Sequence, residues 1–556
     1  MLEIYWQKRP SILAVIIFCL VLGATVLTCG WFRQPFLFPQ WMVIYLFTLF
    51  SIIYVFKDSM VIPQWGKWIN YTLLGLALSL VINIFIQPVP VFSQANLDHL
   101  TFIILFLTFL KLFHCYSAEV LWKYFCWSII VASIVFFSIA YYEYFSGVKL
   151  YNAGSLFAAS LGNINMAAEF IGISFFCQVF LCKQSKNKKL IYFLMALLVV
   201  TVVYLYFARC RSVLIGMMLG SGFLIAIRAF LDWRKCLIIA VASAALIILL
   251  LYFSPTRGLG LYTPEAGLKA SGFGIRWQMI MDALNLFWHH PFGVGPNNYE
   301  FSIVPYQSEI LYQSWQHTHI HPHSEPVRFL VEDGIVVCTL GSLFLLGMLC
   351  KAWRRLSEIY REPLFTLILS LSFYFLAEFL FEFPLSIGIS FITMIMIFAY
   401  ACYRLFPVSI VSISGNLLKS IPGYFIFSVF IGLSGSMIYA NYIDFSNNEN
   451  PAELQKGLYL MPENTYIRMQ LINHYLYSPY LSEKEIKRAE AIIKQGLSYS
   501  PNNIILLNQL VYLYQRMGNL AEACYIAKKY DHWHRQKSIL HPFIIRHCNN
   551  FYYAKA

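Results

Sequence analysis

Long apolar runs alternate with short polar turns along most of the chain. A membrane-spanning helix needs about 20 apolar residues, and about 13 runs approach that length. They lie at 11–31, 40–56, 69–86, 98–113, 120–145, 161–182, 190–207, 213–230, 236–253, 328–350, 364–383, 385–406 and 422–442. The pattern predicts an all-α polytopic membrane protein with about 12–13 transmembrane helices.

Composition agrees with this interpretation. Of 556 residues, 59% are hydrophobic and only 12% are charged, whereas a soluble protein of this size carries roughly a quarter charged residues. The formal charge of +13 is spread over many loops. The charge therefore does not suggest a nucleic-acid partner. Its distribution among the loops instead sets the orientation of the chain in the membrane.

The distribution of lysine and arginine predicts which side each loop occupies. Basic clusters at 183–189, 234–235 and 351–361 fall in alternate connections, which the positive-inside rule places in the cytoplasm together with the N-terminus. Two regions then lie outside. The predicted organisation is a transmembrane bundle at 1–253, an external loop at 254–327, further transmembrane helices at 328–443, and an external domain at 444–556.

The thirteen cysteines do not predict a metal or redox framework. Most of them lie in or beside apolar runs, where cysteine behaves as a small hydrophobic residue. No C-x-x-C pair occurs.

The external tail contains an internal repeat. Residues 457–464 recur as 496–503, with apolar residues at helical spacing around both copies. Paired helices with Pro-x-Asn between the pairs are similar to tetratricopeptide repeats, whose usual period is about 34 residues. Such repeats stack into a concave surface, so the tail is either a peptide-docking surface or a stabilising cap.

Four arginines stand where the charge rule disfavours them. Arg209 and Arg211 lie in the turn between two spans, Arg276 lies in the long loop, and Arg328 precedes Glu332 by four residues. Such arginines can snorkel to lipid phosphates or pair with local carboxylates. Several on one face also suit a pyrophosphate, because the guanidinium donates to two oxygens at once.

Four histidines alternate at the end of the long loop. His317, His319, His321 and His323 could hold zinc from one side of an extended strand, but no acidic or cysteine ligand accompanies them at the required spacing. His323 differs because Ser324, a plausible N-cap, follows it directly. An imidazole can accept a proton from a hydroxyl group near neutral pH, which makes His323 a candidate general base.

Two carboxylates end an apolar span. Glu378 and Glu382 lie one helical turn apart and face the same side. Buried acids are paired or protonated, so structural pairing with an arginine or His323 is the first interpretation. Orientation of the base is the second.

Several of these motifs together resemble the O-antigen ligase and polymerase superfamily. They are His323-Ser324 followed after nine residues by Gly334, the turn Cys210-Arg211-Ser212, and Arg276-Trp277 followed by the glycine-rich stretch 290–299. Stretch 162–168 and Glu382-Phe383-Pro384-Leu385 are similar to patches of the branch that glycosylates pilins and other exported proteins. Cys210 and Asn163-Ile164 depart from that branch's pattern.

The resemblance implies a reaction and a location. An oligosaccharide on undecaprenyl pyrophosphate would be transferred en bloc, with inversion, to a Ser or Thr hydroxyl of an acceptor protein such as pilin. The site and the tail would lie on the periplasmic side of the bacterial inner membrane. Arg209, Arg211 and Arg276 would hold the pyrophosphate and His323 would serve as the base. Ser324, Arg328, Glu378 and Glu382 would support them, and no metal or cofactor is expected.

Two alternative functions are compatible with the same sequence features. Within the superfamily, the acceptor could be lipid A core or a growing O-antigen chain. In another class, the chain could be a transporter of lipid-linked glycans, which predicts inverted repeats and deeply placed ionisable groups. No convincing repeat is found among the apolar runs.

Overall fold

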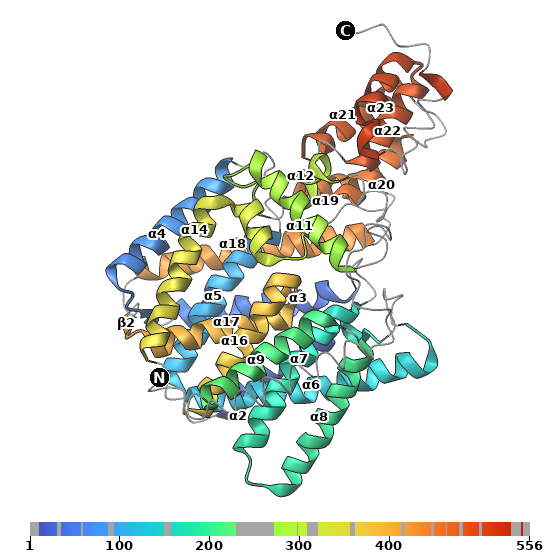
Figure 1. The fold of residues 1–556 in the computed structure, drawn as a ribbon. Helices are drawn as coiled ribbons and strands as arrows, with labels where there is room; N and C mark the ends of the chain where they lie inside the picture. The colour runs from blue at the N-terminus through green and yellow to red at the C-terminus, as the bar shows by residue number, and fades with distance from the viewer. Residues whose placement is uncertain are drawn as a thin grey trace. The chain divides into compact units, whose positions relative to one another are not determined.

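The computed structural model describes residues 10–29, 35–56, 59–86, 94–149, 157–208, 210–229, 272–296, 298–308, 321–355, 362–412, 417–445, 450–462, 464–476, 482–499, 503–534 and 546–548. Within them the chain is almost entirely helical (Figure 1). The helices of the first 460 residues are α2 (Pro10–Val26), α3 (Leu37–Phe56), α4 (Lys67–Ile86), α5 (Gln94–Cys115), α6 (Ala118–Ser146), α7 (Ile164–Gln184), α8 (Lys188–Ala208), α9 (Arg211–Ala229), α11 (Gly272–His289), α12 (Tyr299–Ser302), α14 (Glu325–Arg354), α16 (Pro363–Phe381), α17 (Gly388–Leu405), α18 (Leu417–Phe445) and α19 (Pro451–Leu460). The rest are α20 (Thr465–Leu476), α21 (Glu483–Tyr499), α22 (Ile504–Arg516) and α23 (Leu520–His534), with 3-10 turns η2 (Ala159–Leu161), η4 (Val304–Tyr306) and η5 (Pro384–Ser386).

The predicted fold class, an all-α polytopic membrane protein, is confirmed. Among the described residues, nine helices are long and apolar enough to cross a membrane. The predicted runs at 11–31, 69–86 and 213–230 are also helical, as α2, α4 and α9. The run at 236–253 lies outside the described residues. The four-part division of the chain stays a prediction.

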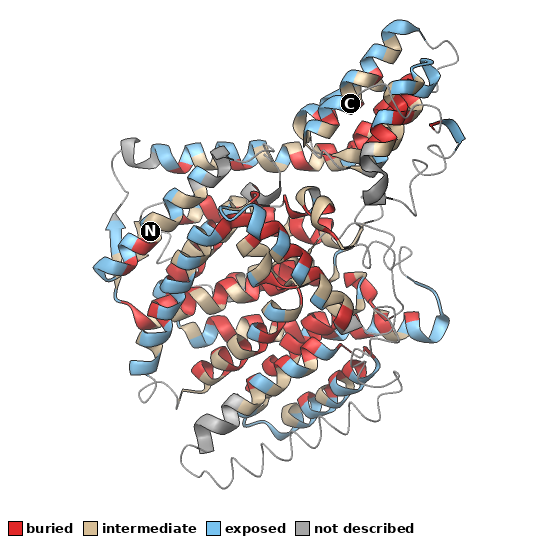
Figure 2. Cartoon of the chain, turned by 45° about the horizontal axis from the view of Figure 1, so that its top comes forward, coloured by how far each residue is buried: buried red, intermediate tan, exposed pale blue. Residues whose placement is uncertain are grey.

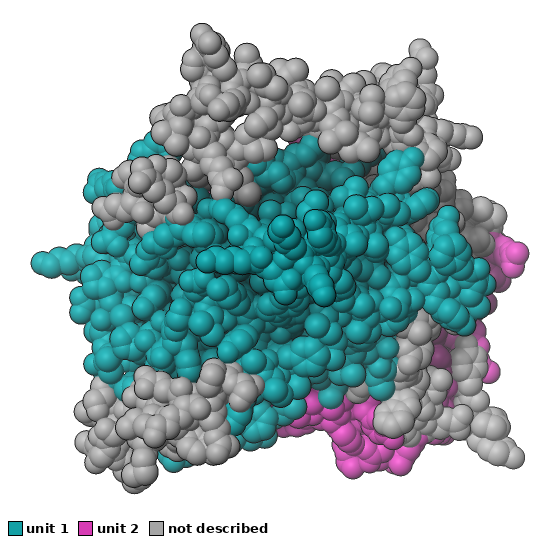
Figure 3. All heavy atoms as spheres, turned by 90° about the horizontal axis from the view of Figure 1, so that it is seen from below, with its two compact units in different colours: residues 1–72, 98–259, 342–432 teal, residues 73–97, 260–341, 433–556 magenta. Residues whose placement is uncertain are grey.

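The chain forms two compact units (Figure 3). Unit 1 comprises residues 1–72, 98–259 and 342–432, and unit 2 comprises 73–97, 260–341 and 433–556. In unit 1, α7, α9 and α16 pack side by side (Figure 1). Tyr374 of α16 lies against both Gly172 and Gly216, where a Cβ atom would come within 2.4 and 2.8 Å of its side chain. Glycine at these places lets three helices approach closely around one buried tyrosine.

Unit 1 also contains a small sheet that the sequence pattern does not indicate. Strand β1 (Ser59–Pro63) pairs antiparallel with β2 (Val408–Ser412). The buried Lys111 ammonium donates to the Ser59 carbonyl at 2.6 Å and to the Tyr54 carbonyl at 2.9 Å. This cation therefore ties β1 to the end of α3.

In unit 2, the predicted repeat in the tail corresponds to two helical hairpins. Asn464 accepts hydrogen bonds from two backbone N–H groups at the start of α20, and Asn503 does the same at the start of α22. The asparagine of each Pro-x-Asn motif is thus a helix N-cap. The hairpins α19–α20 and α21–α22 are present; their kinship with tetratricopeptide repeats stays a prediction.

The tail core includes part of the last apolar helix. Ala440 and Ile443 of α18 are buried in the same hydrophobic cluster as Leu454, Leu471 and residues of α21 to α23. Figure 2 colours the buried residues of the tail helices red and the exposed ones pale blue. The tail is therefore packed onto the end of α18.

A disulfide joins two cysteines of the tail, Cys524 in α23 and Cys548. The sequence analysis did not predict it, because neither cysteine lies in a recognisable spacing motif. The two cysteines are 24 residues apart in the sequence, so their pairing is a tertiary contact.

Candidate functional site

The candidate residues of unit 2 are arranged around a break in α14. Gly334 has φ +81° and ψ 173°, so the helix is interrupted there. The freed carbonyls of Val331 and Glu332 accept hydrogen bonds from the N–H groups of Val294 and Gly295, at 2.9 and 2.8 Å. The Ile335 N–H donates to the Pro291 carbonyl at 2.9 Å. The loop after α11 is therefore held to α14 by three backbone hydrogen bonds.

Two glycines make this contact sterically feasible. A Cβ at Gly293 would lie 2.4 Å from the Glu332 carbonyl oxygen, and one at Gly334 would lie 2.2 Å from the Phe292 carbonyl carbon. Both glycines have positive φ, which side-chain-bearing residues rarely adopt. The motif ending in Gly334 and the glycine-rich stretch 290–299 therefore depend on each other, because each supplies a glycine to the same close backbone contact.

Arg328 is held by acidic residues of its own helix. Its Nε atom lies 3.2 Å from Glu332 Oε2, and Nη1 lies 3.5 Å from Glu325 Oε2. Both glutamates are buried, and Asp333 lies within electrostatic range of Arg328. Pairing of Arg328 with a local carboxylate is one of the alternatives that the sequence leaves open, and the structure has this pairing with Glu332. The sequence analysis does not name Glu325 or Asp333 as neighbours of this arginine. Glu325 lies three residues before Arg328, about one helical turn away, and this spacing is the signal that could have indicated it.

The histidine segment lies directly before this cluster. Ser324 occupies the N-cap position, because its carbonyl accepts the Arg328 N–H at 2.9 Å. His323 has φ +52°, a conformation that costs energy for a residue with a side chain. Burial, and then the neighbouring Arg328 and His323, lower the pKa of His321 to about 3. The structure therefore brings His321, His323 and Arg328 into one neighbourhood.

Arg276 lies in α11, which packs on the same part of α14. Ala283, Leu286 and Phe287 of α11 form a core with Val294, Tyr299 and Val331. Arg276 itself is half-buried near the start of α11. Unit 2 thus contains both Arg276 and His323, on elements joined by one hydrophobic core.

Polar residues that sequence reasoning missed lie beside this core. Asp282 accepts hydrogen bonds from Gln278 Nε2 at 2.9 Å and from the Ser308 N–H at 2.8 Å. Burial raises the pKa of Asp282, and burial together with Asp282 and Glu332 raises the pKa of the fully buried Tyr299. No motif marks these residues in the sequence, since their contacts are non-local.

The candidate residues of unit 1 lie at the start of α9 and at the end of α16, two helices that pack together. Arg211 is the first residue of α9 and is exposed, with Cys210 and Ser212 buried on either side. Cys210 lies between the membrane helices, and burial, followed by Glu378 and Glu382, raises the pKa of its thiol to about 12. Glu378 and Glu382 are both buried, and their effect on the Cys210 thiol indicates that the two carboxylates lie close to the arginine-containing turn.

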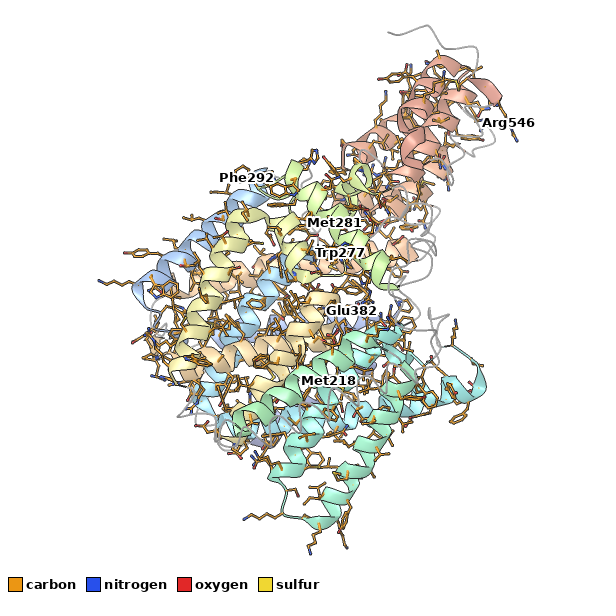
Figure 4. The ribbon with its side chains drawn as sticks, viewed as in Figure 1. Met218, Trp277, Met281, Phe292, Glu382 and Arg546 are labelled. Atoms are coloured by element: carbon orange, nitrogen blue, oxygen red, sulfur yellow. A yellow bond between two sulfur atoms is a disulfide. The ribbon has the colours of Figure 1, made fainter. Side chains whose placement is uncertain are left out.

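Glu382 also connects two sequence patches. Asn165 Nδ2 donates to Glu382 Oε1 at 3.4 Å, and Asn163 caps the same helix α7. Figure 4 labels Glu382 at the C-terminal end of α16. Stretch 162–168 and the Glu-Phe-Pro-Leu patch, separated by more than 200 residues in the chain, therefore meet in unit 1.

The predicted site residues thus fall into two clusters, one in each unit. Unit 1 holds Arg211, Glu378 and Glu382, and unit 2 holds Arg276, His323, Ser324 and Arg328. Arg209, His317 and His319 lie outside the described residues. Across the described part of the chain, no three His, Cys, Asp or Glu side chains are grouped to hold a metal ion.

The helices and their apolar lengths define the class of this chain: it is a multi-pass membrane protein. Residues 194–340 match the family model described as O-antigen ligase, so this part of the chain is similar to that family. The comparison with curated proteins gives no match. The predicted resemblance to the O-antigen ligase superfamily is thereby confirmed. The matched segment contains Arg211, Arg276 and His323, and indicates glycosyl transfer of the ligase or polymerase type from a lipid-linked oligosaccharide.

Proposed function

We propose that the protein is an O-oligosaccharyltransferase. It moves a glycan en bloc from undecaprenyl pyrophosphate to a Ser or Thr hydroxyl of an exported protein such as pilin. The observation that carries the proposal is the match over residues 194–340, which spans all three stretches that hold Arg211, Arg276 and His323.

The environment of Arg211 supports a role in holding the donor. An anion at a helix N-terminus is stabilised by free backbone N–H groups and by the helix dipole. Arg211 begins α9 and is exposed, and no hydrogen bond or ion pair of its side chain occurs within the described residues. Arg211 is therefore available to a diphosphate, with Arg276 and Arg209 as the further donors proposed.

The proposed chemistry is an inverting displacement at the anomeric carbon. The acceptor oxygen forms the new glycosidic bond while the bond from the anomeric carbon to the pyrophosphate oxygen breaks. His323 takes the proton from the acceptor hydroxyl, and the arginines stabilise the negative charge that develops on the leaving pyrophosphate. Arg328, Ser324 and the two glutamates of α16 hold these groups in place.

Two observations favour a protein acceptor on the periplasmic side. The contact between Asn165 and Glu382 joins the two patches that resemble the protein-glycosylating branch. The disulfide between Cys524 and Cys548 is typical of a domain in an oxidising compartment. The tail would then face the periplasm of a bacterial inner-membrane protein, together with the site.

Reconstitution tests the reaction. Purified protein in liposomes with an undecaprenyl-pyrophosphate-linked oligosaccharide and a pilin should yield glycosylated pilin, detected by intact mass. His323→Ala should lower the rate by about 10²–10⁴-fold. His474→Ala, an exposed histidine of α20, is the matched control and should retain the wild-type rate.

The acceptor is tested by competition in the same liposomes. Lipid A core and unmodified pilin are offered together, and the product masses are compared. Glycan on lipid A core with unmodified pilin would exclude the protein acceptor, and lengthened lipid-linked glycan would identify a polymerase. Movement of the intact donor between leaflets, with no transfer, would identify a transporter.

A further inference from the structure

Helix α11 carries an apolar stripe on its exposed side. Trp277, Met281, Leu284 and Trp288 fall within an arc of roughly 60°, because successive residues of an α-helix advance by about 100°. Trp277, Met281 and Trp288 are 56%, 44% and 76% exposed. Figure 4 labels Trp277 and Met281 on this helix. Two tryptophans and a methionine are an unusual surface for a helix that faces only water.

This stripe is separate from the face with which α11 packs. The opposite side of the helix supplies the buried Met279, Ala283, Leu286 and Phe287. The helix therefore has one apolar face in the core of unit 2 and a second apolar face outside it. The core does not account for the second face.

The exposed apolar surface continues towards α14. Phe292, in the loop after α11, is 70% exposed. Its backbone contacts Gly334, directly before Ile335 and Val336, which are 44% and 43% exposed. These two residues belong to α14, one of the helices apolar and long enough to cross a membrane. The stripe therefore adjoins the exposed apolar side of a helix that is long and apolar enough to cross a membrane.

We propose that α11 lies in the plane of the membrane interface and that a phospholipid bilayer covers its Trp277–Trp288 stripe. Tryptophan is enriched where headgroups meet acyl chains, and in-plane helices bury an apolar face at that boundary. On the proposed function, this placement puts Arg276, the neighbour of Trp277, at the depth of lipid phosphates. A diphosphate on a membrane-anchored donor occupies the same depth.

Spin-label accessibility tests the placement in the full-length protein. A nitroxide amino acid replaces Met281, and the protein is reconstituted in nanodiscs of phosphatidylethanolamine and phosphatidylglycerol. Collisions with oxygen, which partitions into lipid, are compared with collisions with a water-soluble nickel chelate. Leu346 of α14 is the lipid-facing reference, and Tyr459 of the tail, 88% exposed, is the aqueous reference.

The label at Met281 is expected to collide with oxygen several-fold more than with nickel, as at Leu346, and the opposite is expected at Tyr459. A label at Trp288 repeats the measurement on the same stripe if the Met281 variant fails to fold. Nickel accessibility like that of Tyr459 would overturn the proposal. Low accessibility to both reagents would overturn it as well, because another part of the chain or a second copy would then cover the stripe. The measurement needs no donor or acceptor, so its failure is distinguishable from a failure of glycosyl transfer.

Discussion

The first turns of α9 and α14 each contain an arginine, but within the described residues only the arginine of α14 is paired with carboxylates. Arg328 of α14 is only 16% exposed and lies between Glu325 and Glu332. Arg211 of α9 is exposed. The buried carboxylates near that turn, Glu378 and Glu382, lie close to Cys210.

The difference separates a structural arginine from one that can bind a ligand. A largely buried arginine with two carboxylate neighbours is already neutralised, and removing it would leave two buried negative charges. An exposed arginine at a helix N-terminus can accept an anion without breaking an existing ion pair. Arg211 is therefore the stronger candidate for donor binding, and Arg328 the stronger candidate for maintaining the fold.

Of the substitutions considered, one at Gly334 of α14 should have the largest effect on stability and on glycosyl transfer. Gly334→Ala places a Cβ 2.2 Å from a backbone carbon at positive φ. The combined strain and overlap should cost roughly 4–6 kcal/mol and abolish transfer. Thermal unfolding in detergent measures the change. Gly341→Ala in the same helix is the control, because nothing lies within 4 Å of its new Cβ. Equal melting temperatures for the two variants would contradict the docking of loop 290–299 on α14.

The two arginines should respond differently to the same substitution. Arg328→Met should destabilise the protein by about 3–5 kcal/mol, because Glu325 and Glu332 lose their partner. Arg211→Met should change stability by less than about 0.5 kcal/mol yet lower the transfer rate by about 10²-fold or more. Thermal unfolding and initial rates of glycosylation separate these effects. A stable, inactive Arg328→Met would reverse the assignment.

Loss of the disulfide should affect the tail alone. Cys548→Ser opens a loop that spans 24 residues, which should cost about 3 kcal/mol. Limited proteolysis should then cleave the tail faster, while the apolar helices remain intact. Cys350→Ser, an exposed free cysteine of α14, should have no such effect. Unchanged proteolysis of Cys548→Ser would argue against the pairing.

The effect of His321 should appear only as a pH dependence of stability. Its folded-state pKa of about 3 is below the ordinary value near 6.5, so the unfolded chain binds a proton first as pH falls. Its stabilising contribution is complete above pH 6.5 and declines towards pH 3. The loss should be at most about 1.4 kcal/mol per pH unit. His321→Gln should show a flatter dependence of melting temperature between pH 6.5 and 4. An identical slope would exclude His321 as its cause.

The sequence predicts the helices well and the contacts among them poorly. Apolar runs of about 20 residues have few alternatives to membrane helices, and α3, α6 and α16 lie where those runs predict. The pairing of β1 with β2 joins two five-residue segments far apart in the chain, which periodicity cannot indicate.

The candidate site shows the same limit. The motif that ends in Gly334 is visible as a spacing, but its reason is the approach of Gly293 from another segment. Similarly, the sequence shows Arg211 and Arg328 as out-of-place arginines, but only the structure shows that Arg211 is exposed while Arg328 lies between Glu325 and Glu332. The contact between Asn165 and Glu382 depends on how α7 and α16 pack. Helix packing cannot be predicted from the sequence pattern alone.

The burial of Ala440 and Ile443 in the tail core has a practical consequence for isolating that domain. A fragment cut after the last apolar helix, near residue 446, would lose two of the side chains that close its interior. It would expose Gly457 and its surroundings to water. A soluble tail suitable for binding studies should therefore keep the final turns of α18, with the lipid-facing positions of those turns made polar.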